Sequence, residues 1–249
     1  YRQVQQMKLA YLLLLVCNIA VAANVELTVA FGQSRPPFVD ETTADGISLR
    51  LFNAVAQQLG WHYKPIFASN QRMQKLLEAG QVDISVEVQP VNAALYYSQP
   101  FISYSNYAFY RSDIELSINK MEDLQPYSIC AWQNAHNHLG IQHWAANKTD
   151  YREYPEQKWQ VADWLNKRCQ LLLIDYTLFK YHLKQFNSRK DKSMSQLEIE
   201  AFNKVPLPGQ TNPLWFYVGF TDKAMRDAFD QQLTLLKQSG RYDQIRQDF

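Results

Sequence analysis

The chain contains 249 residues, with 25 Lys and Arg against 24 Asp and Glu, so its formal net charge at neutral pH is +1. Such a balance gives no reason to expect a nucleic acid or a charged membrane surface as a partner. The length is sufficient for two small lobes or one large domain with an ample core.

The start of the chain predicts a secretory signal peptide. Lys8 is followed by an apolar run over residues 9–22 that ends in small side chains, which is the pattern of a cleaved leader. A membrane helix is the alternative, but a span needs roughly 20 apolar residues, and Asn18 interrupts this run. We therefore expect residues 1–23 to be upstream sequence and leader, and the processed protein to be periplasmic without membrane insertion.

The first strand after the leader ends in a loop that we interpret as the rim of a binding site. Residues 27–31 have the composition of a short buried strand, and Gly32 lets the backbone turn. Pro36 and Pro37 stiffen the loop, because each ring fixes φ and removes an N–H donor. Ligands sit outside the carboxyl ends of strands in open α/β sheets, so this rim, which carries Arg35, indicates a binding protein more than a catalyst.

Strand and helix patterns alternate in the next stretch. Residues 47–59 and 70–79 carry apolar side chains at helical spacing, and a glycine follows each segment. Residues 61–67 and 82–88 fit strands, the second with alternating apolar and polar side chains. Strand, helix, strand, helix, strand predicts a largely parallel sheet.

Five short motifs follow one another in the order of a known protein family. They are the run from Leu76 to Asp83, the turn Tyr97-Ser98-Gln99-Pro100-Phe101, the segment from Ile118 to Leu124, the strand from Leu171 to Asp175, and the tail from Met225 to Phe249. In order and spacing they resemble the family 3 extracellular solute-binding proteins, which serve polar amino-acid ABC transporters. The resemblance covers essentially the whole chain after the leader.

The resemblance implies an α/β protein with the two-lobed periplasmic-binding-protein fold of type II. Each lobe would be a mainly parallel sheet flanked by helices, and two crossover strands would join the lobes. Lobe 1 would comprise residues 24–101 and 214–249, and lobe 2 residues 106–209. The hinges would lie near residues 102–105 and in the turn-rich segment 210–213.

The arginine that holds the ligand carboxylate in amino-acid-binding members of the family has no counterpart here. The chain contains no Lys or Arg between Lys75 and Arg111. A guanidinium forms two charge-assisted bonds to a carboxylate, which lysine cannot match. Arg35 on the rim and Arg72 near the start of a helix, where an anion is already favoured, are the candidate substitutes. For each, the alternative is a solvated surface arginine.

Asp175 and Glu87 are the candidate acids. Asp175 ends an apolar strand at the position where, in the family, an aspartate receives the ligand ammonium group. Capping of the following helix is an alternative or additional role for it. Glu87 shares a strand face with Ser85 and Asp83, and if it points inward it would favour a cationic group. An edge salt bridge is the alternative for Glu87.

Trp132 and Gln133 follow a predicted strand, in the place of the family's lobe-two loop that donates hydrogen bonds. Trp132 would offer a flat wall for cation–π contacts, or would alternatively fill the core. Three histidines follow closely, but neither their spacing nor a nearby Cys or Glu in the sequence supports a zinc site. We expect no metal and no cofactor.

Cys130 and Cys169 lie in two predicted strands, residues 127–131 and 169–174. In an oxidising compartment they can form a disulfide if the strands are neighbours. Two buried free thiols are the alternative, because the Cα separation decides between the two states and the sequence does not give it.

These observations favour a periplasmic solute-binding protein, not an enzyme, that captures a small polar solute such as an amino acid or a derivative. We expect a monomer that serves an ABC permease or a sensor. A periplasmic enzyme of this fold, similar to cyclohexadienyl dehydratase, is the alternative, with Glu87 or His136 as its acid. No nucleophile elbow or phosphate loop accompanies these acids. A third possibility is a ligand-presenting subunit of a sensor.

Overall fold

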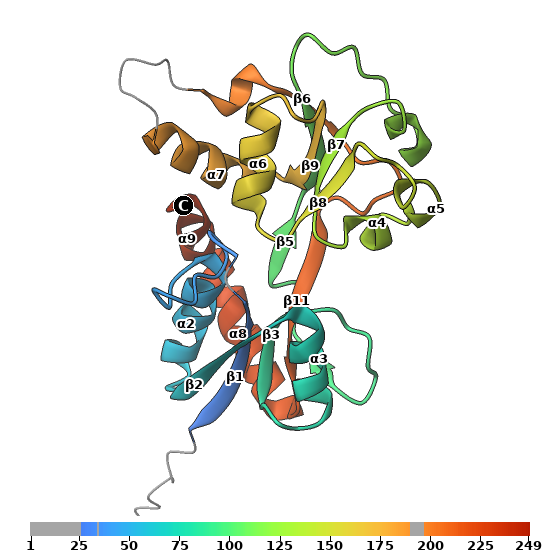
Figure 1. Ribbon diagram of the computed structural model, residues 1–249. Coiled ribbons are helices and arrows are strands. Elements are labelled where there is room, and N and C mark those ends of the chain that lie inside the picture. The colour runs from blue at the N-terminus through green and yellow to red at the C-terminus, as the bar shows by residue number, and fades with distance from the viewer. Residues whose placement is uncertain (1–25, 34, 190–196) are drawn as a thin grey trace, which may run out of the picture.

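Two β-sheets divide the described chain into two halves. The computed structural model describes residues 26–33, 35–189 and 197–249, so the predicted leader at residues 1–23 lies outside the described residues. Each sheet is flanked by helices, and the two halves lie end to end (Figure 1). We call the half built on the N-terminal sheet lobe one, and the other half lobe two.

Lobe one combines the N-terminal part of the chain with its C-terminal segment. Its strands are β1 (Leu27–Gly32), β2 (Tyr63–Ala68), β3 (Ile84–Val88), β4 (Tyr96–Tyr97), β5 (Ile102–Tyr104) and β11 (Leu214–Phe220). Its helices are α2 (Ile47–Gln58), α3 (Asn70–Glu78), α8 (Lys223–Gln238) and α9 (Arg241–Gln247). The strand order is β2-β1-β3-β11-β4, with β5 also paired to β11. Strands β2, β1 and β3 are parallel and β11 is antiparallel to β3, so the predicted strand and helix alternation is confirmed.

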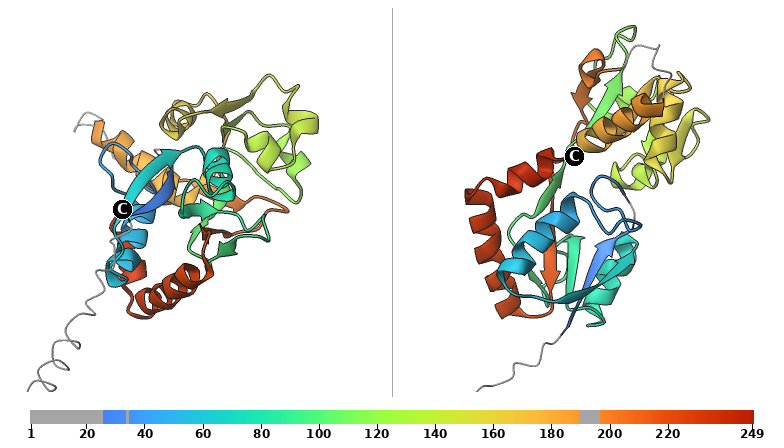
Figure 2. Two further views of the ribbon diagram at one scale, coloured as in Figure 1. Left: turned by 90° about the horizontal axis from the view of Figure 1, so that it is seen from below. Right: turned by 90° about the vertical axis from the view of Figure 1, so that its left-hand side faces the viewer.

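Aromatic side chains fill the core of lobe one. Phe229 of α8 is fully buried, with its ring centroid 5.7 Å from that of Phe52, 6.0 Å from that of Phe101 and 5.3 Å from that of Phe220. Burial of such a side chain contributes roughly 1.5–3 kcal/mol. As a result, α8 and α9 pack beside α2 on one side of the sheet (Figure 2).

Lobe two consists of the middle of the chain. Its strands are β6 (Asn106–Tyr110), β7 (Ile129–Trp132), β8 (Tyr151–Tyr154), β9 (Leu171–Asp175) and β10 (Asn203–Pro206). Its helices are η1 (Met121–Leu124), α4 (Ala135–His138), α5 (Gln142–Ala145), α6 (Gln157–Leu165), α7 (Tyr176–Arg189) and η2 (Ile199–Ala201). The strand order is β10-β6-β9-β7-β8. Strands β9, β7 and β8 are parallel to one another. Strand β6 pairs with β9 in antiparallel orientation, and β10 pairs in the same way with β6.

The chain crosses between the two sheets twice. It passes from β5 to β6 through Ser105, and it returns from β10 to β11 over residues 207–213, where the Asn212–Pro213 peptide bond is cis. The predicted hinge at residues 210–213 falls in the second connection, whereas of the one near residues 102–105 only Ser105 does, because Ile102–Tyr104 form β5. Their role as hinges stays a prediction.

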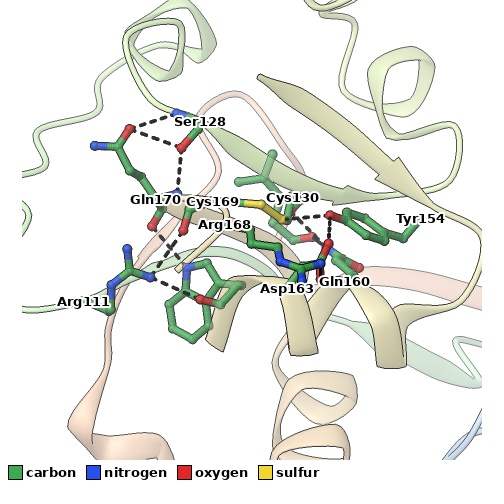
Figure 3. The surroundings of a disulfide bond; sticks show 11 residues. Arg111, Ser128, Cys130, Tyr154, Gln160, Asp163, Arg168, Cys169 and Gln170 are labelled. Carbon is green, nitrogen blue, oxygen red and sulfur yellow. Dashed lines mark hydrogen bonds and ion pairs between the residues drawn. A yellow bond between two sulfur atoms is a disulfide. The ribbon is translucent and has the colours of Figure 1, made fainter. Parts of the chain in front are cut away.

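A disulfide joins two neighbouring parallel strands of lobe two. Cys130 of β7 and Cys169, which precedes β9, are bonded, with their Cα atoms 5.8 Å apart (Figure 3). Both residues are buried, and the Tyr154 hydroxyl lies 3.4 Å from the Cys130 sulfur. The bond holds together the two strands whose carboxyl ends carry Trp132 and Asp175.

Candidate ligand-binding cleft

The carboxyl ends of the lobe-two strands lie at one edge of the sheet and face lobe one. Ile129 pairs with Leu171 on one side and with Tyr151 on the other, so β7, β8 and β9 end at a similar level. A cavity of 430 Å³ lies beyond this edge, lined by Arg35 and Pro36 of lobe one and by α6 and α7 of lobe two. The two lobes therefore form a cleft between them.

The lobe-one rim after β1 is a tight turn. The Arg35 amide donates to the Val39 carbonyl at 2.6 Å, the Phe38 amide donates to the Arg35 carbonyl at 3.0 Å, and the Pro36–Pro37 peptide bond is cis. Gly46 has φ +133°, and a Cβ atom there would lie 2.4 Å from the Phe38 carbonyl oxygen. Only glycine fits this close approach, which sets the rim turn against the start of α2.

Arg35, which lines the 430 Å³ cavity, forms a largely buried ion pair with Glu87 of β3. Arg35 Nη2 lies 2.5 Å from Glu87 Oε2 and 2.6 Å from the Tyr104 hydroxyl. The Tyr104 hydroxyl donates to the same Glu87 oxygen at 2.5 Å, and Ser48 donates to the other oxygen. Burial lowers the pKa of Arg35, but Tyr104 and Glu87 outweigh it and the pKa is raised. The four side chains therefore form one polar cluster, in which the Arg35 Nε is left without a hydrogen-bond partner.

Glu87 reaches this cluster through an unusual backbone conformation. Its φ is +66°, which is rare for a residue with a side chain, and the register of β3 against β11 shifts beside it. Its side chain is only 3% exposed. Asp83, which alternation places on the same face, instead accepts bonds from Thr28 at the opposite end of the strand. Residues held in such conformations cluster at functional sites in proteins generally.

Asp175 links the crossing strand to the start of α7. It is 3% exposed, and its carboxylate accepts bonds from the amides of Ser105 at 2.6 Å, Thr177 at 2.8 Å and Leu178 at 3.0 Å. The capping role foreseen for it is present. Burial raises the pKa of Asp175 to about 6, although these amides and the charge of Arg35 act in the opposite direction. Ser105, which donates to Asp175, directly follows Tyr104, whose hydroxyl contacts Arg35, so Asp175 lies one residue along the crossing from the lobe-one cluster.

The contribution of Asp175 to stability is expected to depend on pH. Its pKa rises from 3.8 to about 6 on folding, so its stabilising contribution is complete below pH 3.8 and is lost as the pH rises through 6. Relative to the variant Asp175→Asn, the wild type should gain on the order of 2–3 kcal/mol of unfolding free energy from about pH 7.5 to about pH 4. Urea unfolding of both proteins at the two pH values measures this gain. A difference that stays constant with pH would contradict the prediction.

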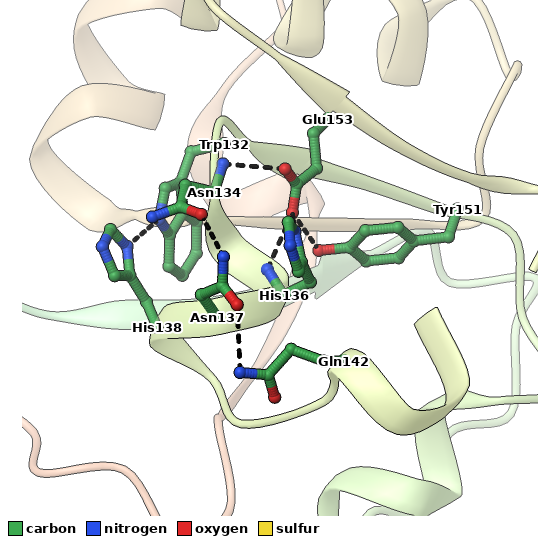
Figure 4. A network of polar contacts seen from close by, with 8 residues as sticks. All are labelled: Trp132, Asn134, His136, Asn137, His138, Gln142, Tyr151 and Glu153. Carbon is green, nitrogen blue, oxygen red and sulfur yellow. Dashed lines mark hydrogen bonds and ion pairs between the residues drawn. The ribbon is translucent and has the colours of Figure 1, made fainter. Parts of the chain in front are cut away.

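The lobe-two loop after β7 is organised by Glu153, a residue of β8. The Glu153 carboxylate accepts bonds from the amides of Asn134 and His136, each at 2.7 Å, and from the Tyr151 hydroxyl at 2.8 Å (Figure 4). The His136 ring Nδ1 also lies 2.8 Å from it. Burial raises the pKa of Glu153, but the bonds from His136, Tyr151 and Asn134 outweigh this and hold it below its usual value. The loop therefore already contains an anion supplied by the protein.

Trp132 and Gln133 begin this loop. Trp132 is partly buried, and its indole N–H donates to His138 Nδ1 at 3.1 Å (Figure 4). Gln133 is exposed, and its backbone amide donates to the Tyr154 carbonyl at 3.0 Å. The structure therefore places both residues at the carboxyl edge of the sheet, near the level of Asp175.

Arg72 lies apart from these groups. It is exposed on α3, and it is not among the residues that line the 540 Å³ cavity beside that helix. That cavity is lined instead by Asn70, Lys75, Glu87 and Phe216 together with their neighbours. Arg35 lines the 430 Å³ cavity and contacts Glu87. The structure therefore brings together Arg35 and Glu87 but not Arg72.

Sequence reasoning missed Glu153 and the residues that line the 430 Å³ cavity from α6 and α7. Glu153 lies 19 positions beyond Asn134, and only the parallel pairing of β7 with β8 brings it to the loop. The sequence did contain a signal for a site at α6, because Lys158 and Trp159 lie in the first turn of a helix that follows Pro155. Residues on helices escape an interpretation based on the ends of β-strands.

The histidines of the β7 loop do not form a metal cluster. In the ranges that the structure describes, no group of three or more His, Cys, Asp or Glu side chains has an arrangement able to hold a metal ion. Within the same ranges, no helix is both long and apolar enough to cross a membrane.

The fold and its two facing edges define a two-lobed solute-binding protein. Residues 27–249 match the bacterial extracellular solute-binding proteins, family 3, and the chain belongs to this family. The resemblance inferred from the five sequence motifs is thereby confirmed. A comparison with curated protein sequences gives no match.

Solved structures with this fold cover most of the chain at low identity. The GluR0 ligand-binding core in complex with L-glutamate is 16% identical, with 90% of this chain and 97% of that chain covered and a TM-score of 0.67. An ancestral cationic amino acid solute-binding protein is 17% identical, with 90% and 94% covered and a TM-score of 0.66. A histidine kinase sensor domain with similarity to periplasmic binding proteins is 17% identical, with 90% and 95% covered and a TM-score of 0.64. At these identities the likeness establishes the fold, which confirms the predicted type II architecture.

Proposed function

We propose that this protein binds a small polar solute, an amino acid or a related molecule, in the cleft between its lobes. The observation that carries the proposal is a chain of hydrogen bonds across the first crossing: Tyr104 contacts Arg35 and Glu87 of lobe one, and the next residue, Ser105, donates to Asp175 of lobe two. Charged groups from both lobes converge where the chain crosses between them. A solute that contacts both lobes favours the closed arrangement by its differential affinity for it.

The side chains of the cleft have distinct proposed roles. Asp175 and Glu87 favour a cationic group of the solute through their charges. Arg35 uses Nη2 for Glu87 and Tyr104, whereas its buried Nε has no hydrogen-bond partner and is the donor available to an anionic group. Trp132 and Gln133 face the solute from lobe two. Arg72, which is exposed, is the weaker candidate for the anionic group.

We also propose that the protein is exported and delivers its solute to a partner in the membrane. The disulfide suits an oxidising compartment such as the periplasm. An ABC-type permease is the partner that the family suggests. A sensor is the second candidate, which the structural likeness to a histidine kinase sensor domain favours. In either case the protein binds its solute without converting it.

Calorimetry of the purified protein against amino acids, small peptides, polyamines and organic acids tests this function. We expect a saturable heat of binding for at least one class. Silence across the whole panel would count against solute binding. Turnover of a prephenate-like acid would show an enzyme instead.

The variant Asp175→Ala is expected to lower the affinity for the solute found in that panel by at least about tenfold, or 1.4 kcal/mol of binding free energy. The reason is that it removes the lobe-two charge at the crossing. The variant Asp175→Asn keeps the helix cap, because Asn and Asp cap equally well, and so separates lost charge from lost folding. The exposed Asp150 provides the control Asp150→Ala, which should leave affinity unchanged. An affinity for Asp175→Ala within about twofold of the wild type would place the site elsewhere.

A further inference from the structure

The cavity between the rim turn and lobe two has the size and position of a solute pocket. Its volume of 430 Å³ lies within the roughly 300–1,000 Å³ of small-molecule sites. Arg35 and Pro36 line it from lobe one, and residues of the β8–α6 junction and of α7 line it from lobe two. A molecule bound here touches both lobes.

The lining of the cavity carries more basic than acidic side chains, although Glu87 outside the lining pairs with Arg35. Among the described residues that line it, Arg35, Lys158 and Arg189 are cations, and Glu156 is the one acid. Glu156 pairs with Lys158 at 2.5 Å, but their side chains are 58% and 48% exposed. Such a pair contributes little, and a bound anion competes with it readily.

The start of α6 strengthens this preference. The helix begins at Gln157, and its N-cap residue Glu156 makes no side-chain capping bond, so the first-turn amides remain without that cap. The positive end of the helix dipole favours an anion. Burial and the charge of Lys158 together lower the pKa of His182, on the opposite wall, to about 4, so His182 is a neutral hydrogen-bonding group.

Aromatic and apolar side chains complete the wall. Trp159 is 59% exposed, with its ring centroid 5.3 Å from Lys158 Nζ. Pro36, Pro155, Val161 and Tyr181 line the same cavity. An amphipathic acid therefore finds a cationic end and an apolar surface in one place.

Two other parts of the chain offer no binding site for an anion. No Lys or Arg occurs between Lys75 and Arg111. In the loop after β7, the amides of Asn134 and His136 are already bound by Glu153. The cationic cavity, in contrast, has Arg35, Lys158 and Arg189 in its lining.

We infer that the cavity between the rim turn and helices α6 and α7 holds the anionic end of the solute, and that the solute is a small carboxylic acid with an aromatic body. Its carboxylate lies among Arg35, Lys158 and Arg189, and its ring packs on Trp159. The inference rests on the proposed function, because Arg35 both lines this cavity and contacts Glu87 and Tyr104 in the proposed binding cluster.

Phenylacetate, its neutral isostere phenylacetamide and inorganic phosphate are the probes that test it, by calorimetry and by tryptophan fluorescence of the full chain. We expect phenylacetate to bind at least about tenfold more tightly than either of the other two. The variants Lys158→Gln and Arg189→Gln should each lower the affinity for phenylacetate by about tenfold and leave the affinity for phenylacetamide unchanged. Trp159→Phe should remove most of the fluorescence change.

Lys184→Gln is the matched control, because Lys184 is an exposed cation of α7 outside the cavity lining. Equal affinity for acid and amide, equal affinity for phosphate, no binding of phenylacetate at millimolar concentration, or equal effects of Lys158→Gln and Lys184→Gln would each overturn the inference. In that case, a heat of binding for another solute of the calorimetry panel would still support the proposed function. No heat of binding for any solute of the panel would contradict both the proposed function and this inference.

Discussion

The variant Glu87→Ala is expected to lower the free energy of unfolding by about 3 kcal/mol, because it leaves the Arg35 guanidinium without its partner in a largely buried site. The expected loss lies at the low end of the range for buried pairs, since the Arg35 side chain retains 25% exposure. Ser48 and Tyr104 lose their acceptor at the same time. Urea unfolding at neutral pH measures the difference.

Two further variants make this result decisive. Glu156→Ala removes an acid of an exposed pair and should change stability by less than about 0.5 kcal/mol. The double variant Arg35→Met with Glu87→Leu removes both charges and should recover much of the loss, because no uncompensated charge remains. A loss below about 1 kcal/mol for Glu87→Ala would mean that water solvates Arg35 and that the pair does not organise the cleft.

Much of the fold could be predicted from local patterns. Helix α2 was expected over residues 47–59 and spans Ile47–Gln58, because its apolar face repeats at helical spacing. Strand β11 was expected at Leu214–Phe220 and has these bounds. Such patterns require only neighbours in sequence, and the motifs that carried the family resemblance are equally local.

The partners within the cleft could not be predicted in this way. Arg35 and Glu87 are 52 positions apart, and their contact depends on a positive φ at Glu87 that simple alternation does not foresee. Glu153 reaches its loop only through strand pairing. Arg72 stands where a helix start favours an anion, yet its side chain is exposed, because helical position alone does not fix the direction of a long side chain.

Replacing both cysteines of the disulfide by alanine is expected to cost about 4 kcal/mol of unfolding free energy. The bond closes a loop with a sequence separation of 39, and the chain-entropy relation gives this magnitude when an unfolded chain is released from such a loop. Urea unfolding of the oxidised wild type and of Cys130→Ala with Cys169→Ala measures the cost. A change below about 1 kcal/mol would mean that the unfolded segment keeps structure or that native strain offsets the gain.

The same variant connects stability with binding. Strand β7 leads into the loop of Trp132 and Gln133, and β9 ends at Asp175, so the disulfide fixes two strands whose ends form the lobe-two wall. Each single variant, Cys130→Ala or Cys169→Ala, breaks the same bond and should cost nearly as much as the double variant. Solute affinity should fall along with stability, because the loss of preorganisation is added to the cost of binding. Unchanged affinity in a destabilised variant would show that the sheet alone sets the positions of these side chains.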